Sequence, residues 1–118
     1  MLFRSMEDMI RFTTAAKNAR KNSLIVSDLP INSYQTEQDA VANSSKLIQA
    51  GADAVKLEGG EEVAKIITAI TESGIQVMGH LGLLPQTAKK YTVQGKTKED
   101  AIRLIKDEIG RASCRERV

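Results

Sequence analysis

Hydrophobic residues recur along this chain with two different periods, which predict helices and strands in turn. The first apolar face has helical spacing and comprises Met6, Met9, Ile10, Thr13 and Ala16. Residues 24–26 (LIV), which lead into Ser27-Asp28, form a short β-branched run that predicts a strand. Residues 36–39 (TEQD) have the spacing of a capping box and open a second helix, which Gly51 ends. The inward face of that helix is predicted to comprise Ala40, Val41, Ser44, Leu47 and Ile48.

The same alternation continues in the second half of the chain. Residues 54–58 (AVKLE) predict a strand, and residues 75–80 (IQVMGH) predict a third. Between them a helix is predicted up to Gly74 from the spacing of Val63, Ile66, Ile67 and Ile70. Residues 97–100 (TKED) cap a last helix, which contains Ile102 and Ile105. This order predicts an α/β fold with parallel strands joined by right-handed crossovers, which a doubly wound sheet and a (β/α)8 barrel share.

The two ends of the chain lack this pattern. Residues 109–118 (IGRASCRERV) match a forward translation of a common sequencing adapter, and residues 2–5 (LFRS) fit the reverse strand of the same adapter. We therefore interpret residues 1–5 and 109–118 as non-native tails, and we expect them to make no packing contacts. Residues 6–108 are interpreted as the natural part of the chain.

The net charge and the single cysteine of the chain depend on these ends. The whole chain has a formal net charge of +2, but residues 6–108 carry 13 basic and 14 acidic side chains. With a net charge of −1, this part of the chain has no excess of positive charge that would favour nucleic-acid binding. The one cysteine, Cys114, lies in the C-terminal tail, so the natural part offers no disulfide or thiol chemistry. Since no apolar run is long enough to cross a bilayer and no signal peptide is recognisable, we expect a cytoplasmic protein without a membrane partner.

Polar residues stand at the predicted carboxyl end of each strand, namely Asp28, Glu58 and His80. Functional groups of parallel α/β proteins gather at these ends, so the three residues are candidates for a functional site. Lys56 and Glu58 are two positions apart and therefore project from the same face of their strand. Buried charges of this kind require partners. A metal ion and an anionic substrate would supply them.

Each of these residues also has a structural interpretation. Lys56 and Glu58 fit an ion pair at a strand end. Asp28 fits a turn or cap, and His80 fits a histidine whose hydrogen bonds are satisfied within the fold. Gly59-Gly60 fits a phosphate-binding turn at a helix N-terminus, but the two glutamates that follow would repel an anion.

Three motifs together resemble one known family. They are LIVSDLP (24–30) followed by SYQT, GADAVKLEGG (51–60), and GIQVMGHLGLLPQ (74–86) followed by YTVQGKT. In order, spacing and strand placement they resemble the successive signatures of the ketopantoate hydroxymethyltransferase family, over nearly all of residues 23–97. Residues 87–90 depart from the family, because this stretch is shorter than its counterpart.

The resemblance implies that residues 6–108 are a fragment of a single (β/α)8 TIM-barrel domain, comprising its third to fifth strands with their helices. It implies a transferase of pantothenate biosynthesis that adds a hydroxymethyl group from 5,10-methylenetetrahydrofolate to 3-methyl-2-oxobutanoate, giving ketopantoate through a Mg²⁺-stabilised enolate. The full-length enzyme would be a homo-oligomer, a decamer in the bacterial family. The general base and one metal ligand would lie outside this chain, which by itself would be inactive.

The resemblance also implies roles for four residues. Asp28 and Glu58 correspond to ligands of Mg²⁺, and Asp28 would also contact the substrate. Lys56 would bind the carboxylate or keto oxygen of the substrate and take part in catalysis, and His80 would be catalytic by hydrogen bonding near the reacting centre. Two alternatives stay open: another Mg²⁺-dependent keto-acid barrel of the phosphoenolpyruvate mutase or isocitrate lyase type, and a non-catalytic α/β module that binds a phosphate at Gly59-Gly60.

Overall fold

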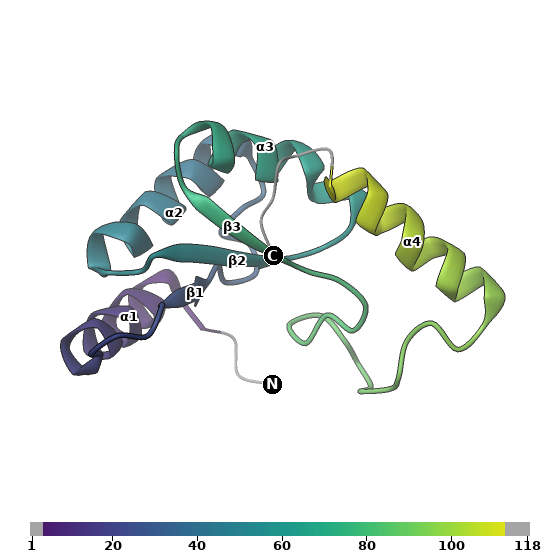
Figure 1. Cartoon of the computed structure of the whole chain (residues 1–118), viewed down its shortest axis with the longest axis horizontal. Helices are drawn as coiled ribbons and strands as arrows, with labels where there is room; N and C mark the ends of the chain where they lie inside the picture. The colour runs from purple at the N-terminus through teal and green to yellow at the C-terminus, as the bar shows by residue number, and fades with distance from the viewer. Residues whose placement is uncertain (1–3, 113–118) are drawn as a thin grey trace.

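A parallel three-stranded sheet lies at the centre of the computed structural model, which describes residues 4–112 (Figure 1). Its strands β1 (Val26–Asp28), β2 (Ala54–Glu58) and β3 (Gln76–His80) lie side by side in chain order. Each strand is followed by a segment that contains a helix, as in consecutive β/α units of a barrel. The predicted α/β fold, with three parallel strands of a partial TIM barrel, is confirmed.

Helices cover one face of this sheet. Within residues 4–112 they are α1 (Met6–Ala19), α2 (Glu37–Ala50), the 3-10 helix η1 (Glu61–Val63), α3 (Ala64–Glu72) and α4 (Lys98–Ala112). The helix α2 packs between α1 and α3, whereas α4 lies to one side, against η1 and α3 (Figure 1). None of the described helices is long and apolar enough to span a membrane.

The sheet has an apolar face and a polar face. Val55, Leu57 and Val77 point toward the helices and are almost completely buried, where they join a core that includes Leu29, Leu47, Ile67 and Ile70. The alternate residues of the strands project from the opposite face. A parallel strand in the interior of a protein is normally apolar on both faces. The charges that β2 carries on its second face therefore mark that face as the candidate functional surface.

Side-chain caps and glycines set the ends of the helices. The Thr36 hydroxyl accepts a hydrogen bond from the Asp39 N–H at 3.0 Å, which confirms the predicted start of α2. Gly51 ends α2 with φ +117°, a left-handed conformation in which a side chain would be strained. Gly74, with φ +89°, follows α3 in the same manner.

Two predicted details of strand length and packing are wrong. β1 begins at Val26 rather than at residue 24, because Val26 already pairs with Ala54, the first residue of β2, and leaves Leu24 exposed. Ala16 is exposed near the C-terminal end of α1, beyond the part of the helix that packs at Thr13. The last helix is predicted to contain Ile102 and Ile105, and both are exposed on α4, which packs against η1 and α3.

Two residues of the predicted N-terminal tail contact α1, contrary to the expected lack of packing, whereas the interpretation of both tails as non-native stays a prediction. The Ser5 hydroxyl accepts from the Asp8 N–H at 3.1 Å, and the Asp8 carboxylate accepts from the Ser5 N–H at 3.2 Å, which closes a capping box at α1. The Arg4 guanidinium lies 5.2 Å from the centre of the Phe12 ring. At the other end, α4 continues past residue 108 to Ala112. Residues 1–3 and 113–118, with Cys114, lie outside the described residues.

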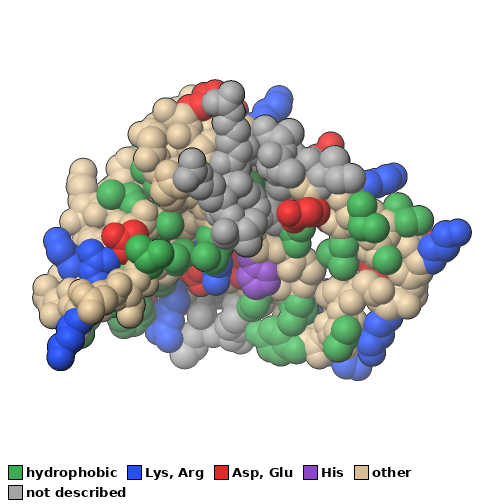
Figure 2. All heavy atoms as spheres, viewed as in Figure 1, with side chains coloured by type: hydrophobic (Ala, Val, Ile, Leu, Met, Phe, Trp, Pro, Cys, Tyr) green, Lys and Arg blue, Asp and Glu red, His purple; other side chains and the backbone are tan. Residues whose placement is uncertain are grey.

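The connection from β3 to α4, residues 81–97, contains no helix or strand. Hydrophobic side chains remain at the surface over this loop and over α4 (Figure 2), and they include Tyr91, Val93, Ile102 and Ile105. The loop passes the carboxyl ends of the strands before it reaches α4 (Figure 1). It therefore contributes to the surroundings of the candidate site.

Candidate functional site

The carboxyl ends of the strands bring the four predicted site residues together on the polar face. In the register of the sheet, Asp28 pairs with Lys56, and Glu58 pairs with His80. Lys56 and Glu58 are two positions apart on β2, so these two pairs form neighbouring rows on one face. Asp28, Lys56, Glu58 and His80 thus surround one region at the edge of the sheet. Their roles there stay predictions.

Lys56 forms an ion pair with Asp28 across the two strands, with 2.9 Å between Nζ and Oδ1. The side chain of Lys56 is 29% exposed and that of Asp28 is 47% exposed. A pair this accessible to water contributes only about 0–1 kcal/mol to stability. The alternative of an ion pair between Lys56 and Glu58 does not describe the contact seen here, since the partner of Lys56 lies on β1. Both groups remain accessible to a bound ligand.

Glu58 is the more buried of the two candidate carboxylates, with 9% of the residue exposed. Its Oε2 accepts a hydrogen bond from the main-chain N–H of Gln86 at 3.3 Å. A carboxylate can accept several hydrogen bonds or metal contacts, so this bond orients Glu58 and leaves capacity for a ligand.

The hydroxyl of Tyr34 also contacts Glu58, to whose main-chain carbonyl it donates at 3.2 Å. Burial raises the pKa of the Tyr34 phenol, the bond to this carbonyl opposes the rise, and the negative charges of Glu58, Asp28 and Glu62 add to it. A phenol is protonated at neutral pH even without this rise in pKa, so Tyr34 acts as a hydrogen-bond donor. Its hydroxyl lies within the electrostatic reach of both candidate carboxylates.

The side chain of Gln86 connects the loop after β3 with the loop after β1. Its Oε1 accepts from the Ile31 N–H at 2.7 Å, and its Nε2 donates to the Leu29 carbonyl at 3.3 Å. Sequence reasoning did not select Gln86 or Tyr34 as site residues, although the motifs LLPQ and SYQT contain them. Both stand in loops, where hydrophobic periodicity gives no indication of which side chains reach the site.

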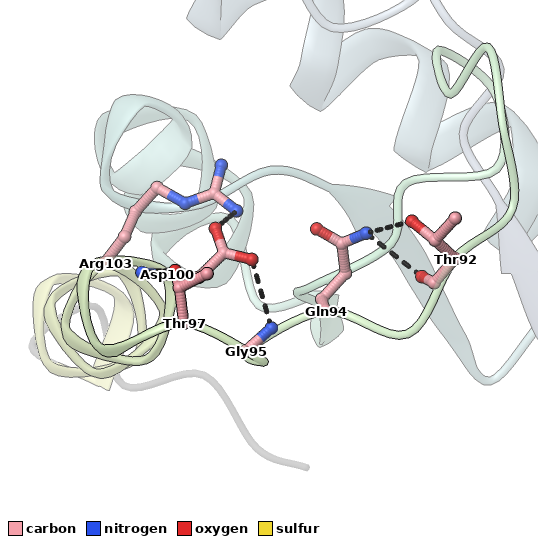
Figure 3. A network of polar contacts seen from close by, with 6 residues as sticks. All are labelled: Thr92, Gln94, Gly95, Thr97, Asp100 and Arg103. Carbon is pink, nitrogen blue, oxygen red and sulfur yellow. Dashed lines mark hydrogen bonds and ion pairs between the residues drawn. The ribbon is translucent and has the colours of Figure 1, made fainter.

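The other half of the same loop is fixed at the start of α4 (Figure 3). The Asp100 carboxylate accepts from the Gly95 N–H at 3.2 Å and forms an ion pair with Arg103 at 2.9 Å. The Asp100 N–H donates to the Thr97 hydroxyl at 3.1 Å, which confirms the predicted cap of α4. The loop is thus held at Gln86 on one side and at Gly95 on the other.

The Gly59-Gly60 turn does not offer free amides to a phosphate. The N–H of Gly59 donates to the His80 carbonyl at 3.2 Å, and that of Gly60 donates to the Glu62 carboxylate at 2.9 Å. The next N–H, of Glu61, donates to the Asp107 carboxylate of α4 at 3.3 Å. Two of the three acceptors are negatively charged, so the turn is already occupied by carboxylates, and the phosphate-binding alternative loses its support.

A cavity of about 200 Å³ adjoins this turn between the strand ends and α4. Glu62, Asp107 and Arg103 are the charged residues of its lining. Two carboxylates face one guanidinium there, and Arg103 is already paired with Asp100. The lining therefore does not favour an anion.

The chemistry of the two strand-end carboxylates fits a hard divalent cation. Asp28 and Glu58 supply only oxygen donors, which Mg²⁺ prefers. Asp28 would share its charge between Lys56 and a cation, which its second oxygen allows. Among residues 4–112, no three His, Cys, Asp or Glu side chains gather into a metal-binding group.

Comparison with known proteins gives a consistent result. Residues 3–112 match the model of the family described as ketopantoate hydroxymethyltransferase. The chain is 55% identical over 107 residues to the 3-methyl-2-oxobutanoate hydroxymethyltransferase of Nitrosopumilus maritimus, a match that covers 87% of this chain and 38% of that protein. It is 49% identical over 109 residues to the enzyme of that name from Saccharolobus solfataricus, with 89% and 41% covered.

A bacterial protein of the same name, from a Thermoanaerobacter species, is 48% identical to the chain over 108 residues, with 87% of this chain and 39% of that protein covered. The chain spans about two fifths of the length of these curated relatives. The family match extends over all but eight of its 118 residues. The chain therefore belongs to the ketopantoate hydroxymethyltransferase family.

Proposed function

We propose that the chain is part of a transferase that moves a hydroxymethyl group from 5,10-methylenetetrahydrofolate to 3-methyl-2-oxobutanoate and so forms ketopantoate. The observation that carries the proposal is the strand register at the carboxyl edge of the sheet. It places Asp28 beside Lys56 and Glu58 beside His80. This arrangement joins oxygen donors for a cation and a positive charge for an anion on one face, in a chain of this family. A keto acid that chelates a divalent cation requires both.

Lys56 supplies the positive charge for the substrate. Its ammonium group holds Asp28 at 2.9 Å and is partly exposed, so a carboxylate or keto oxygen of the substrate can become a further partner. An ammonium group has three N–H donors and can serve both partners at once. Lys56 thereby orients the keto acid relative to the two strand-end carboxylates.

Asp28 and Glu58 are proposed to hold Mg²⁺, and His80 to donate or accept a hydrogen bond near the reacting carbon. When bound, the cation supplies Lewis-acid stabilisation of the negative charge that develops on the keto oxygen. Tyr34 and Gln86 hold Glu58 by its main-chain carbonyl and its carboxylate, respectively. The group that removes the proton from the substrate is expected in a part of the enzyme outside this chain.

The experiment is an assay of ketopantoate formation by a chimera in which residues 6–108 replace the matching segment of the Nitrosopumilus maritimus relative. We expect turnover that depends on Mg²⁺, on the keto acid and on the folate. Asp28→Asn and Glu58→Gln should each abolish turnover and weaken Mg²⁺ binding, while the circular dichroism spectrum stays that of the parent. A folded but inactive chimera contradicts the proposed activity, and near-normal turnover of either variant contradicts the metal-binding role of that residue.

A further inference from the structure

Gln86 makes hydrogen bonds to residues at the carboxyl ends of two strands other than the one it follows. Its side-chain amide forms hydrogen bonds with the main chain of Leu29 and Ile31, which follow β1 and lie 57 and 55 positions earlier in the sequence. Its main-chain N–H bonds the carboxylate of Glu58 at the end of β2. Gln86 itself stands in the loop that follows β3. One residue thus contacts the segment next to Asp28 and the carboxylate of Glu58.

An amide side chain matches both ends of this connection. The main chain of the β1 loop presents an N–H at Ile31 and a carbonyl at Leu29, so the bridging group must accept one hydrogen bond and donate another. A carboxylate offers acceptors only and an ammonium donors only, whereas the glutamine amide offers both. The bridge also fixes the main chain of Gln86, and with it the N–H that orients Glu58.

We propose that Gln86 is a positioning residue that sets Asp28 and Glu58 relative to each other for binding of a divalent cation. The inference rests on the proposed function, because it takes these two carboxylates as metal ligands. Leu29 directly follows Asp28, and its N–H bonds the Lys56 carbonyl of β2 at 2.8 Å. The bonds from Gln86 to Leu29 and Ile31 hold this loop from its other side. Loss of the amide removes both bonds to the segment after Asp28 and, with them, the restraint on the main-chain N–H that orients Glu58.

Gln94 is a matched control from the same loop. Like Gln86 it is partly buried, but the contacts of its amide are to the Thr92 carbonyl and hydroxyl, two positions away, at 3.0 and 3.3 Å (Figure 3). Substitution of Gln94 therefore removes a glutamine amide from the same loop but keeps the hydrogen bonds that Gln86 makes to Leu29 and Ile31.

The test uses the chimera described above, with Gln86→Met and Gln94→Met. Methionine keeps the length and approximate volume of glutamine and removes its hydrogen bonds. Mn²⁺ binding is measured by electron paramagnetic resonance in the absence of substrate, and unfolding of the metal-free protein is followed by heating. For Gln86→Met we expect a dissociation constant about 10–100-fold above that of the parent, the range typical for loss of groups that orient metal ligands. Gln94→Met should remain within about twofold.

Parent-like Mn²⁺ affinity of Gln86→Met overturns the inference, as does an equal loss of affinity in both variants. If Gln86→Met unfolds on its own, Gln86→Asn replaces it, because the shorter amide cannot reach both loops, and the same loss of affinity is expected. Parent-like affinity of that variant overturns the inference equally. An unsubstituted chimera without Mg²⁺-dependent turnover contradicts the proposed function itself, whereas tight Mn²⁺ binding by Gln86→Met in an active chimera contradicts only the role of Gln86.

Discussion

At the scale of single residues, the ion pair between Lys56 and Asp28 places a cation next to a proposed metal ligand. The two groups lie 2.9 Å apart and both are partly exposed. Their mutual attraction adds little to stability in water. A substrate carboxylate that displaces water from Lys56 would gain a charge-assisted hydrogen bond in a drier environment. The pair is therefore better suited to ligand binding than to holding the strands together.

Replacement of Lys56 by alanine tests this view. Loss of one hydrogen bond to a charged group costs about 1.5–3 kcal/mol, so the KM for the keto acid in the chimera should rise by roughly 10–150-fold. The free energy of unfolding should change by no more than ~1 kcal/mol. Lys46→Ala on α2, whose ammonium lies 3.4 Å from the Asn43 side chain, is the control and should leave KM unchanged. An unchanged KM in Lys56→Ala would mean that the ion pair is structural.

Asp53 links α1 to the start of the sheet and gives a prediction for acid pH. Its carboxylate accepts from the Ile25 N–H at 2.9 Å and pairs with Arg20, and both contacts hold the pKa of Asp53 below its ordinary value. A carboxyl group whose pKa is lower in the folded than in the unfolded state stabilises the fold above its unfolded pKa, near 4, and loses that contribution as pH falls through the folded pKa. Asp53→Asn should thus be less stable than the parent at pH 7 and closer to it at pH 3.

The measurement is urea unfolding of the chimera and its Asp53→Asn variant at pH 7, 5, 4 and 3. The difference in unfolding free energy between the two proteins should shrink as pH falls below about 4. A difference that stays constant over this range would show that the contacts of Asp53 do not depend on its charge.

The strand-end residues could be predicted from the sequence, but the residues that form hydrogen bonds to Glu58 could not. The period of a strand determines both where it ends and which side chains share a face. These two properties were enough to predict Asp28, Lys56, Glu58 and His80 as site residues. Tyr34 and Gln86 reach Glu58 from loops, across 24 and 28 positions of sequence. No local pattern encodes where a loop side chain will point, so these contacts required the three-dimensional structure.

At the scale of elements, the turn between β2 and α3 is closed by α4. The Asp107 carboxylate accepts from the Glu61 N–H, and a Cβ atom at Gly60 would stand only 2.3 Å from that carboxylate. Gly60 is therefore required by the close approach of α4. The sequence indicated a turn at Gly59-Gly60, but no local pattern showed that a helix residue 46 positions after Glu61 covers it.

Gly60→Ala should displace α4 from this turn. Insertion of a methyl group into a packed contact typically costs about 1–3 kcal/mol, which urea unfolding of the chimera would measure. If the contact with Asp107 is the cause, Asp107→Ala should relieve the clash, so the double variant should lose less stability than the sum of the two single variants. Strict additivity would place the cost of Gly60→Ala elsewhere.

The N-terminal cap of α1 should contribute measurably to stability. Ser5 closes a capping box at α1, so Ser5→Ala should lower the free energy of unfolding by ~1 kcal/mol. Thr14→Ala is the comparison within the same helix, because the Thr14 hydroxyl bonds the Ile10 carbonyl and caps nothing. A change of less than ~0.5 kcal/mol in Ser5→Ala would restore the interpretation of residue 5 as part of an inert tail.

Taken as one unit, the described part of the chain is built on an open sheet of three parallel strands. β1 and β3 each have one neighbour, so within residues 4–112 the sheet has two open edges. Its polar face also carries Val26, which is 36% exposed, and Met78. In a closed barrel the corresponding face is filled by side chains from all strands. The order and direction of the strands could be predicted from periodicity alone, but a barrel could not be told from a doubly wound sheet without the family resemblance.

The chain expressed alone should be poorly folded and inactive. Open sheet edges and exposed apolar groups favour association with other chains, so we expect dye-detectable hydrophobic surface and a broad unfolding transition. The chain spans about two fifths of its relatives, and loss of a general base by itself lowers rates by about 10²–10⁴-fold. Ketopantoate formation is assayed for the chain and for the chimera at equal concentrations. Turnover by the chain alone that depends on Mg²⁺ would mean that residues within it supply the complete site, and the interpretation that the general base lies outside this chain would have to be abandoned.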